Sequence, residues 1–342
     1  MKLTDFDYHL PPDRIAQNPL QQRDASRLLV VDRGTHTFHH TQFSQIGEYL
    51  PDAALLVLND TKVIPARLIG NKSGTGGKVE LLLIREKKTD IWETLAKPRR
   101  NLRIGTQIVF GNGILTAEVI AKPDDGYCIV RFNYKGTFLT ILADIGMMPL
   151  PPYIRRAPNA EDKARYQSVY AATEGAIAAP TAGLHFTQEL LAELKDNRIE
   201  TATLTLHVGP GTFQSVKVED IQTHKMHAEY IHLAETEANR ICSAREAGVK
   251  IIAIGTTVVR ALETAGITGT VHPYSGYSEL FIYPGHRFNA VDALVTNFHL
   301  PKSTLLMLVS AFAGKDLIQR AYQEALQYNY RFYSYGDAML IL

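Results

Sequence analysis

A central stretch of the 342-residue chain, residues 66–150, limits what the protein can fold into, because helical patterns almost vanish from it. Its segments are short and either rich in β-branched residues or alternating in polarity, with glycine or proline between them. They are 78–84, 90–96, 106–110, 114–120 and 127–132. Five or six short strands at this spacing are typical of a small antiparallel barrel. We therefore predict a β-barrel domain here, closed by a helix at 138–146 and a proline-rich linker.

The chain on either side of this stretch alternates between strand and helix patterns. The continuous apolar run 53–58 is typical of a strand buried on both faces. Further strands are expected at 200–206, 249–254, 278–283 and 292–298, a hairpin at 26–40, and helices at 45–50, 188–197, 256–266, 303–314 and 317–326. Such alternation favours a mixed sheet with helices on its faces. The predicted fold class is α/β: residues 1–65 and 151–342 form a discontinuous catalytic domain, and 66–150 an inserted barrel.

Composition excludes several classes of protein. The hydrophobic fraction of 45% and the charged fraction of 21% are ordinary for a folded protein. The N-terminus carries Asp5 and Asp7 where a signal peptide needs an apolar stretch, and no apolar run is long enough to span a membrane. Cys128 and Cys242 form no pair motif. We expect a cytoplasmic monomer without membrane contact.

The common cofactor motifs are missing. No glycine-rich dinucleotide loop, phosphate-binding loop or H-E-x-x-H zinc motif occurs in the sequence. His224 and His227 have a spacing that brings two imidazoles to one face of a helix, but no third ligand follows at a recognisable interval. We therefore expect neither a metal nor a resident cofactor.

Polar residues follow four of the expected strands. They are Asn59, Asp60, Thr61, Lys62 and Arg67 after the first, His207, Gly209 and Thr212 after the second, Thr256 and Thr257 after the third, and Asn297, His299, Lys302 and Ser303 after the fourth. Ligands of α/β sheets bind outside the carboxyl ends of the strands, so these residues predict a shared pocket. The alternative is that each turn merely caps a helix. His185, just before a helix, is either functional or satisfied by backbone.

Positive charge gathers in the predicted barrel. Residues 66–150 hold thirteen Lys and Arg against eight Asp and Glu, a net charge of +5 in a chain whose total is +1. The densest cluster is Lys97, Arg99, Arg100 and Arg103, and Arg155 and Arg156 follow. Clustered basic side chains bind polyanions by releasing condensed counterions, which makes RNA a candidate partner. The alternative is a solvated surface loop.

Long motifs across the whole chain carry a resemblance. They include FDYHLPPDRIAQNP (6–19), NDTKVIPARL (59–68), MPLPPYIRR (148–156), APTAGLHFT (179–187), HVGPGTF (207–213), HKMHAEY (224–230), GTTVVRALE (255–263) and TNFHLPKSTLLMLVSAF (296–312). The sequence resembles the S-adenosylmethionine:tRNA ribosyltransferase-isomerases of queuosine biosynthesis. The resemblance implies an α/β domain with an inserted β-barrel. It also implies transfer and isomerisation of the ribosyl part of S-adenosylmethionine onto 7-aminomethyl-7-deazaguanine at the tRNA wobble position, giving epoxyqueuosine-tRNA, adenine and methionine.

This chemistry suggests roles for the polar residues. S-adenosylmethionine is a consumed substrate, and the acidic methylene beside its sulfonium requires a base. We assign acid or base roles to Asp60, His185, His207 and His227, with Glu229 behind them. Arg260, Lys302 and the turn of Thr256 and Thr257 are candidates for holding substrate anions. Tyr8, Phe186, Phe213 and Phe298 are candidate stacking surfaces, with core packing as the alternative. Lys97, Arg99, Arg100 and Arg103, with Arg155 and Arg156, are candidate tRNA contacts.

Two other classes of function stay open at this stage. A non-catalytic RNA-binding factor would use the basic barrel but leave the polar strand ends idle. A methyltransferase would use the same sulfonium differently. The small products of one incubation with S-adenosylmethionine and tRNA separate the three: adenine with methionine, S-adenosylhomocysteine, or neither.

Overall fold

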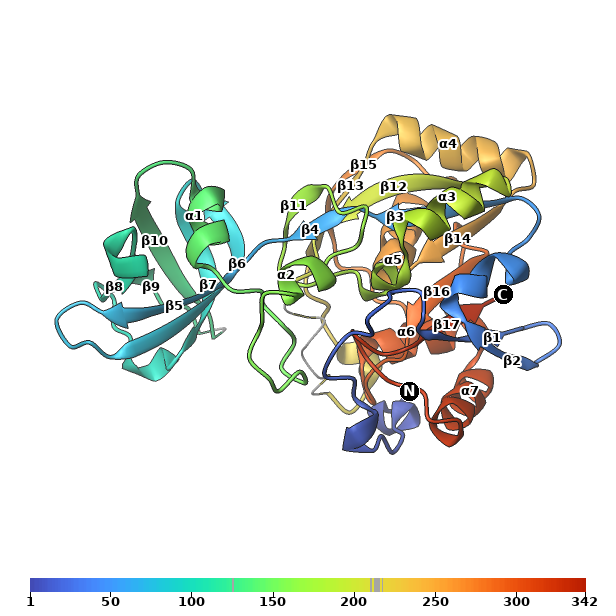
Figure 1. Cartoon of the computed structure of the whole chain (residues 1–342), viewed down its shortest axis with the longest axis horizontal. Coiled ribbons are helices and arrows are strands. Elements are labelled where there is room, and N and C mark those ends of the chain that lie inside the picture. Colours follow the sequence, from blue (N-terminus) through green and yellow to red (C-terminus); the bar gives the residue numbers. More distant parts are fainter. Residues whose placement is uncertain (125, 210, 212–215, 217) are drawn as a thin grey trace.

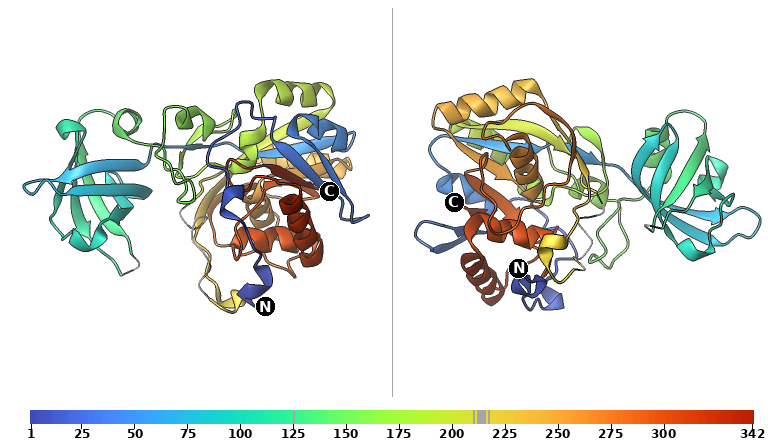
Figure 2. Two further views of the ribbon diagram at one scale, coloured as in Figure 1. Left: turned by 60° about the horizontal axis from the view of Figure 1, so that its bottom comes forward. Right: turned by 180° about the vertical axis from the view of Figure 1, so that it is seen from behind.

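The computed structural model describes residues 1–124, 126–209, 211, 216 and 218–342. Within these residues the chain builds a nine-stranded sheet covered by helices and, apart from it, a closed barrel of six strands (Figure 1). The barrel stays set off from the sheet in the other two views, joined to it by a narrow neck (Figure 2). The predicted fold class, a mixed α/β sheet with a small antiparallel barrel, is confirmed.

The large sheet has four parallel strands at its centre. They are β12 (Ile199–Leu206), β3 (Ala54–Asn59), β14 (Lys250–Ile254) and β16 (Ala293–Asn297), in that order. Antiparallel strands extend one side, β13 (Glu229–Leu233) and β15 (Tyr274–Ser278). On the other side lie β17 (Ala338–Ile341), β1 (Arg27–Val31) and β2 (Phe38–Gln42). Because the central strands run the same way, their carboxyl ends meet at one edge.

Both faces of the sheet are covered, as the apolar run 53–58 predicted. Leu55 and Val57 of β3 pack into the core beneath α4 (Glu235–Glu246), α5 (Thr256–Ala265), α6 (Thr304–Ala313) and α7 (Lys315–Gln327). Leu56 and Leu58 face the other way, against α3 (Gln188–Asp196) and a 3-10 helix at Phe43–Tyr49. A strand buried on both faces is apolar at every position, so β3 shows no alternation.

The barrel closes in the order β10-β7-β6-β5-β8-β9. Its strands are β5 (Arg67–Lys72), β6 (Lys78–Lys88), β7 (Ile91–Lys97), β8 (Gln107–Phe110), β9 (Leu115–Ala121) and β10 (Cys128–Tyr134). Helix α1 (Phe138–Ile145) buries Ile141 and Leu142 in the barrel core. A two-stranded parallel sheet of β4 (Thr61–Val63) and β11 (Thr173–Ala176) lies in the neck, near α2 (Asp162–Arg165).

The prediction of a strand at 278–283 is wrong. The strand is β15 (Tyr274–Ser278), because pairing with β13 runs from Leu233 opposite Tyr274 to Glu229 opposite Ser278. The apolar residues that follow pack against the core from irregular chain. Helix α4 was not predicted, because only Ala238 and Ile241 of its twelve residues are buried and its apolar periodicity is weak. No helix among the described residues is long and apolar enough to cross a membrane.

Candidate active site at the carboxyl edge of the sheet

The carboxyl ends of the predicted strands do lie together. Side-chain hydrogen bonds of Asn59 connect β3 with the end of β12 and with the start of α5, which follows β14. Its amide nitrogen donates to the Leu206 carbonyl at 3.0 Å and to the Thr257 hydroxyl at 3.3 Å. Its amide oxygen accepts from the backbone N–H groups of Leu206, at 2.9 Å, and Thr61, at 3.2 Å. A buried amide with both ends satisfied in this way holds β3, β12 and the start of α5 in a fixed relation. Asn59 is thus a scaffold for the predicted pocket.

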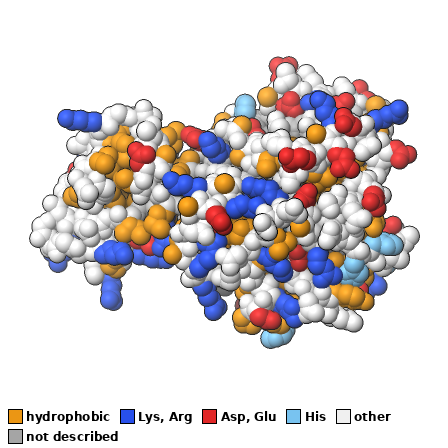
Figure 3. Space-filling model, in the orientation of Figure 1, with side chains coloured by type: hydrophobic (Ala, Val, Ile, Leu, Met, Phe, Trp, Pro, Cys, Tyr) orange, Lys and Arg blue, Asp and Glu red, His pale blue; other side chains and the backbone are white. Residues whose placement is uncertain are grey.

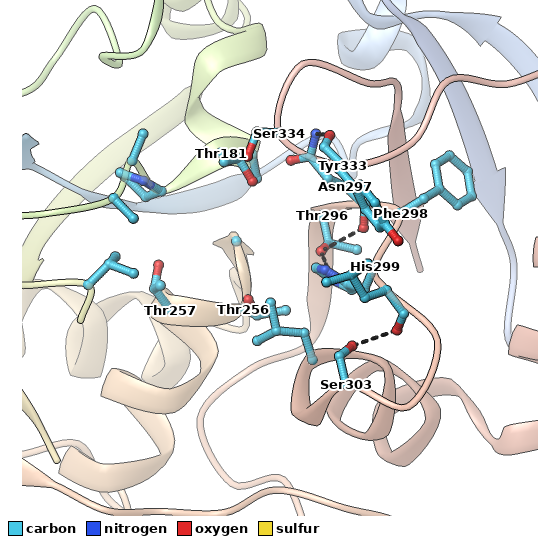
Figure 4. Close-up of a pocket in the computed structure, with 18 of the residues that line it drawn as sticks. Thr181, Thr256, Thr257, Thr296, Asn297, Phe298, His299, Ser303, Tyr333 and Ser334 are labelled. Carbon is cyan, nitrogen blue, oxygen red and sulfur yellow. Dashed lines mark hydrogen bonds between the residues drawn. The ribbon is translucent and has the colours of Figure 1, made fainter. Parts of the chain in front are cut away.

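A small cavity, named the enclosed cavity because buried side chains form most of its wall, lies at this edge and is partly open to solvent (Figure 4). Thr256 and Thr257 at the start of α5 face Thr296, Asn297 and His299 at the end of β16 across it. Among the described residues that line it, none is Asp, Glu, Lys or Arg. The cavity therefore suits an uncharged group, since an ion placed there would lose its hydration without gaining a partner.

His185 lies behind the wall of this cavity. Its Nδ1 is 2.7 Å from the Ser26 hydroxyl, and its Nε2 is 3.1 Å from the amide nitrogen of Asn297. The ring stacks on Phe43 with a centroid distance of 4.9 Å. Burial lowers the pKa of His185 to about 3, and the charges of Arg331 and Arg23 add to this effect. The imidazole is neutral near pH 7, and both ring nitrogens are engaged.

His299 and Ser303 also have structural partners. The His299 Nε2 is 2.8 Å from the Thr296 hydroxyl, and burial lowers the pKa of His299 to about 3. Ser303 caps α6 by accepting the Leu306 N–H at 3.1 Å, which is the capping alternative raised by the sequence. Both residues nevertheless line the cavity.

A second, wider cavity lies between the barrel and the sheet and is open to solvent. Val208 lines both cavities, so the two adjoin each other. In contrast to the enclosed cavity, this interdomain cleft holds charged side chains from both bodies, among them Arg85, Glu93 and Glu279. It also holds aromatic rings: Trp92, Tyr127 and Phe138 from the barrel, and Tyr230 and Tyr277 from the sheet.

His207 enters this cleft from the end of β12. Its Nδ1 is 2.8 Å from the Thr61 hydroxyl, and its ring packs on Gly175, where an added Cβ would come within 2.8 Å of Nε2. Asp60 accepts hydrogen bonds from the hydroxyls of Thr205, at 2.6 Å, and Thr173, at 3.2 Å. Burial lowers the pKa of His207, and the negative charge of Asp60 partly offsets this. A half-buried imidazole that is neutral near pH 7 is suited to accept a proton.

Glu229 and Arg260 form a buried ion pair at the floor of the cleft. Their closest oxygen and nitrogen are 2.5 Å apart, and the side chains are 3% and 7% exposed. The other Glu229 oxygen accepts the Gly209 N–H at 2.9 Å. Arg260 also reaches the Ser278 carbonyl at 3.4 Å. One carboxylate oxygen of Glu229 therefore holds the loop that follows His207, and the other is paired with Arg260 on α5.

Other predicted residues lie apart from these groups. His227 is exposed in the cleft. Lys62, Arg67 and Lys302 line neither cavity and form ion pairs with Glu174, Glu80 and Asp7, at 3.0, 2.8 and 2.7 Å. Thr212 and Phe213 fall outside the described residues. In that described part, no group of three or more His, Cys, Asp or Glu residues is arranged to hold a metal ion.

The aromatic candidates divide between core and cavity. Phe186 is fully buried and packs edge-on against Phe43, which matches the core-packing alternative. Tyr8 packs against Tyr322 and donates to the His299 carbonyl at 2.5 Å. Phe298 lines the enclosed cavity. No sequence signal pointed to Tyr230, Tyr277 or Tyr333, because an aromatic residue in a strand or loop gives no periodicity that separates cavity from core.

The basic candidates also divide. Lys97, Arg100 and Arg103 are exposed on the barrel, whereas Arg99 donates to the carbonyls of Tyr127, at 3.3 Å, and Pro123, at 2.5 Å. Tyr127 lines the interdomain cleft, but none of the four cluster residues lines either cavity. Figure 3 shows Lys and Arg side chains along the lower side of the barrel and across the neck. Arg155 is exposed, and Arg156 forms a two-pronged ion pair with buried Asp162, at 2.7 and 2.8 Å.

Comparison with known proteins decides the family. The family model described as "Queuosine biosynthesis protein" matches residues 3–341. The chain belongs to this family. Two relatives, from Symbiobacterium thermophilum and Caldanaerobacter subterraneus, are 53% and 52% identical, over 100% of each chain, and both are named S-adenosylmethionine:tRNA ribosyltransferase-isomerase. A crystal structure of S-adenosylmethionine tRNA ribosyltransferase from Thermotoga maritima is similar, with 39% identity, a TM-score of 0.57, and coverage of 99% of this chain and 100% of that one. The resemblance seen in the sequence is confirmed.

Proposed function

We propose that this protein transfers and isomerises the ribosyl moiety of S-adenosylmethionine onto 7-aminomethyl-7-deazaguanine at the wobble position of tRNA. The products are epoxyqueuosine-tRNA, adenine and methionine. The observation that carries the proposal is identity above 50% over the full length of relatives named for this activity. Within the same proposal, S-adenosylmethionine is consumed as a substrate without a resident cofactor, and the protein acts as a cytoplasmic monomer.

The geometry of the site supports separate binding places for the two substrates. The enclosed cavity is uncharged, whereas the cleft beside it holds charged and aromatic groups and lies between the two bodies. A base from a single-stranded loop is recognised by splaying it out and stacking it on aromatic rings. Tyr230 and Tyr277, which pack edge-to-face at 5.6 Å, offer such a surface in the cleft. The target base then lies beside His207.

His207 is the group best placed to act as the general base. It lies where the two cavities adjoin, next to Val208, and its pKa is lowered, so its neutral form prevails near pH 7. Thr61 and Asp60 orient the imidazole and its surroundings. Glu229, which is tied to Arg260 and Gly209, holds the loop that carries His207 and is proposed as a positioning residue.

A product assay tests the proposed function. The purified protein is incubated with S-adenosylmethionine and tRNA carrying the 7-aminomethyl-7-deazaguanine base, and the small molecules and digested nucleosides are separated. We expect adenine, methionine and epoxyqueuosine in equal amounts. S-adenosylhomocysteine would indicate methyl transfer instead, and the absence of any product would indicate an RNA-binding protein.

A single variant tests the role of His207. Replacing a general base with an inert side chain costs about 10²–10⁴-fold in turnover, so we expect His207→Ala to lower kcat within that range. The matched control is His232→Ala, an exposed histidine on β13 that lines neither cavity. Its turnover should stay close to that of the unaltered protein. If His207→Ala retains more than a tenth of the activity while its fold is intact, another group is the base.

A further inference from the structure

Asn297 is a buried amide with one end satisfied and the other end without a partner. Its side chain is 2% exposed in the wall of the enclosed cavity (Figure 4). The amide nitrogen has two acceptors, the His185 Nε2 and the Tyr333 carbonyl, each at 3.1 Å. In the described part of the chain no group donates to the amide oxygen. Buried polar atoms in native proteins nearly always have partners, so an unpaired acceptor in a cavity wall points to a ligand that donates.

The neighbours of Asn297 fix which end of the amide faces the cavity. The Tyr333 carbonyl can only accept, so the NH₂ end of Asn297 must face it, at 3.1 Å. The same NH₂ group faces the His185 Nε2 at 3.1 Å, so this nitrogen is the acceptor of the neutral ring. The ring proton is then on Nδ1, which lies 2.7 Å from the Ser26 hydroxyl. The oxygen is left for the cavity.

We propose that the enclosed cavity binds the adenine of S-adenosylmethionine and that the Asn297 oxygen accepts a hydrogen bond from its exocyclic amine. This inference rests on the proposed function and names the part of the substrate that each cavity takes. His185 is then a positioning residue that holds the amide of Asn297, in place of the acid or base role suggested by the sequence.

The lining of the cavity selects adenine from the parts of the substrate. The methionine end carries an ammonium and a carboxylate, and the sulfonium is a cation, whereas adenine is neutral, flat and a hydrogen-bond donor. No described residue of the lining is Asp, Glu, Lys or Arg, so only the neutral part enters without an unpaired charge. Tyr333 offers an apolar face, and the first N–H groups of α5, at Thr256 and Thr257, are donors for ring nitrogens.

The position of the cavity agrees with this assignment. Val208 separates the enclosed cavity from the interdomain cleft. Adenine on one side of Val208 leaves the ribose at the junction, beside His207, where the target base reaches it from the cleft. Adenine is the group that departs, and its cavity lies on the other side of Val208 from the charged side chains of the cleft.

The test compares S-adenosylmethionine with its 6-oxo analogue, in which a carbonyl replaces the exocyclic amine. A site built to accept from a donor rejects an analogue without it, so we expect the unaltered protein to prefer S-adenosylmethionine by about 100-fold or more in kcat/KM. Asn297→Ala should bring that preference to about tenfold or less, because the discriminating acceptor is gone. If Asn297 had a purely structural role, its replacement would lower kcat/KM for both substrates alike and leave their ratio unchanged. That result would overturn the proposal.

Two further variants define the test. His185→Phe keeps a ring against Phe43 but removes the acceptor for the amide nitrogen, so we expect the preference for S-adenosylmethionine to fall here also. An unchanged preference would contradict a positioning role for His185. The control is Ser310→Ala, a buried hydroxyl on α6 that does not line the cavity, for which both turnover and preference should be unchanged.

Binding to the unaltered protein keeps the proposal testable if the variants do not fold. Calorimetry should give a Kd for S-adenosylmethionine at least about tenfold lower than for the 6-oxo analogue. Adenine should likewise displace S-adenosylmethionine better than hypoxanthine does. Equal binding of the two members of each pair would overturn the adenine assignment. These readouts need no turnover, so a failure of the proposed reaction and a failure of this assignment are distinguishable.

Discussion

The two bodies of this protein use polar residues in opposite ways. At the edge of the sheet, polar groups are buried and mutually hydrogen-bonded, as Asn59, His185 and the Glu229–Arg260 pair show. On the barrel, the charges of Lys97, Arg100 and Arg103 are exposed to water. Catalysis benefits from groups that are already desolvated and oriented. Binding to RNA needs exposed cations that replace the counterions on its phosphates. The difference is the one that the proposed division of labour requires, with chemistry at the sheet and RNA binding at the barrel.

The largest effect that tests this contrast concerns ion pairs. Removing one partner of a buried pair costs about 3–5 kcal/mol, so Glu229→Ala should lower the free energy of unfolding by that amount. The double variant Glu229→Leu with Arg260→Leu should recover much of it, because no buried charge is left unpaired. On the barrel, Glu80→Ala breaks a partly exposed pair with Arg67 and should cost about 0–1 kcal/mol. Urea unfolding measures the stability of all three variants. Equal losses of stability in Glu229→Ala and Glu80→Ala would contradict the contrast between the sheet and the barrel.

The next effect is the response to acid. His185 and His299 have pKa values near 3 in the folded protein, well below the ordinary value of 6.5, so the unfolded chain binds more protons between these limits. Stability is therefore fully present above pH 6.5 and falls as the pH drops toward 3, by about 1.4 kcal/mol per pH unit for each histidine.

Residues 66–150 contain no histidine, so the sheet should respond to acid before the barrel. Unfolding free energies measured between pH 6 and pH 5 give the slope, and amide hydrogen exchange shows which body opens first. His299→Gln should reduce the slope of the unfolding free energy against pH by about the contribution of one histidine. Earlier opening of the barrel would show that acid acts through other groups.

The smallest effect concerns the barrel charges. Replacing Lys97, Arg100 and Arg103 by Glu should weaken tRNA binding by about tenfold or more at 0.15 M salt. It should also reduce the slope of log affinity against log salt concentration, by about one for each phosphate that the variant no longer binds. Lys195→Glu, on exposed α3, is the control and should change neither quantity appreciably. Fluorescence anisotropy of labelled tRNA over a salt series measures both, and unchanged affinity would move the RNA surface toward Arg155.

The sequence by itself determined the fold class and predicted the edge of the sheet at which polar residues gather. The unbroken apolar run of β3 and the polar residues after four strands were enough, because parallel strands bring their carboxyl ends together. The resemblance of long motifs indicated the reaction. The apolar residues at 279–283 misled the assignment of a strand, because burial against a core does not require pairing in a sheet.

Only the tertiary structure decided what each polar residue does. Spacing placed Glu229 and His185 among the acids and bases, but their contacts with Arg260 and Asn297 come from elements distant in the sequence. The same holds for Lys302 and Arg156, whose charges are paired with Asp7 and Asp162. A local pattern records which side chains are polar, whereas hydrogen-bond partners and burial depend on contacts between segments far apart in the chain. The division into an uncharged cavity and a charged cleft arises in this way.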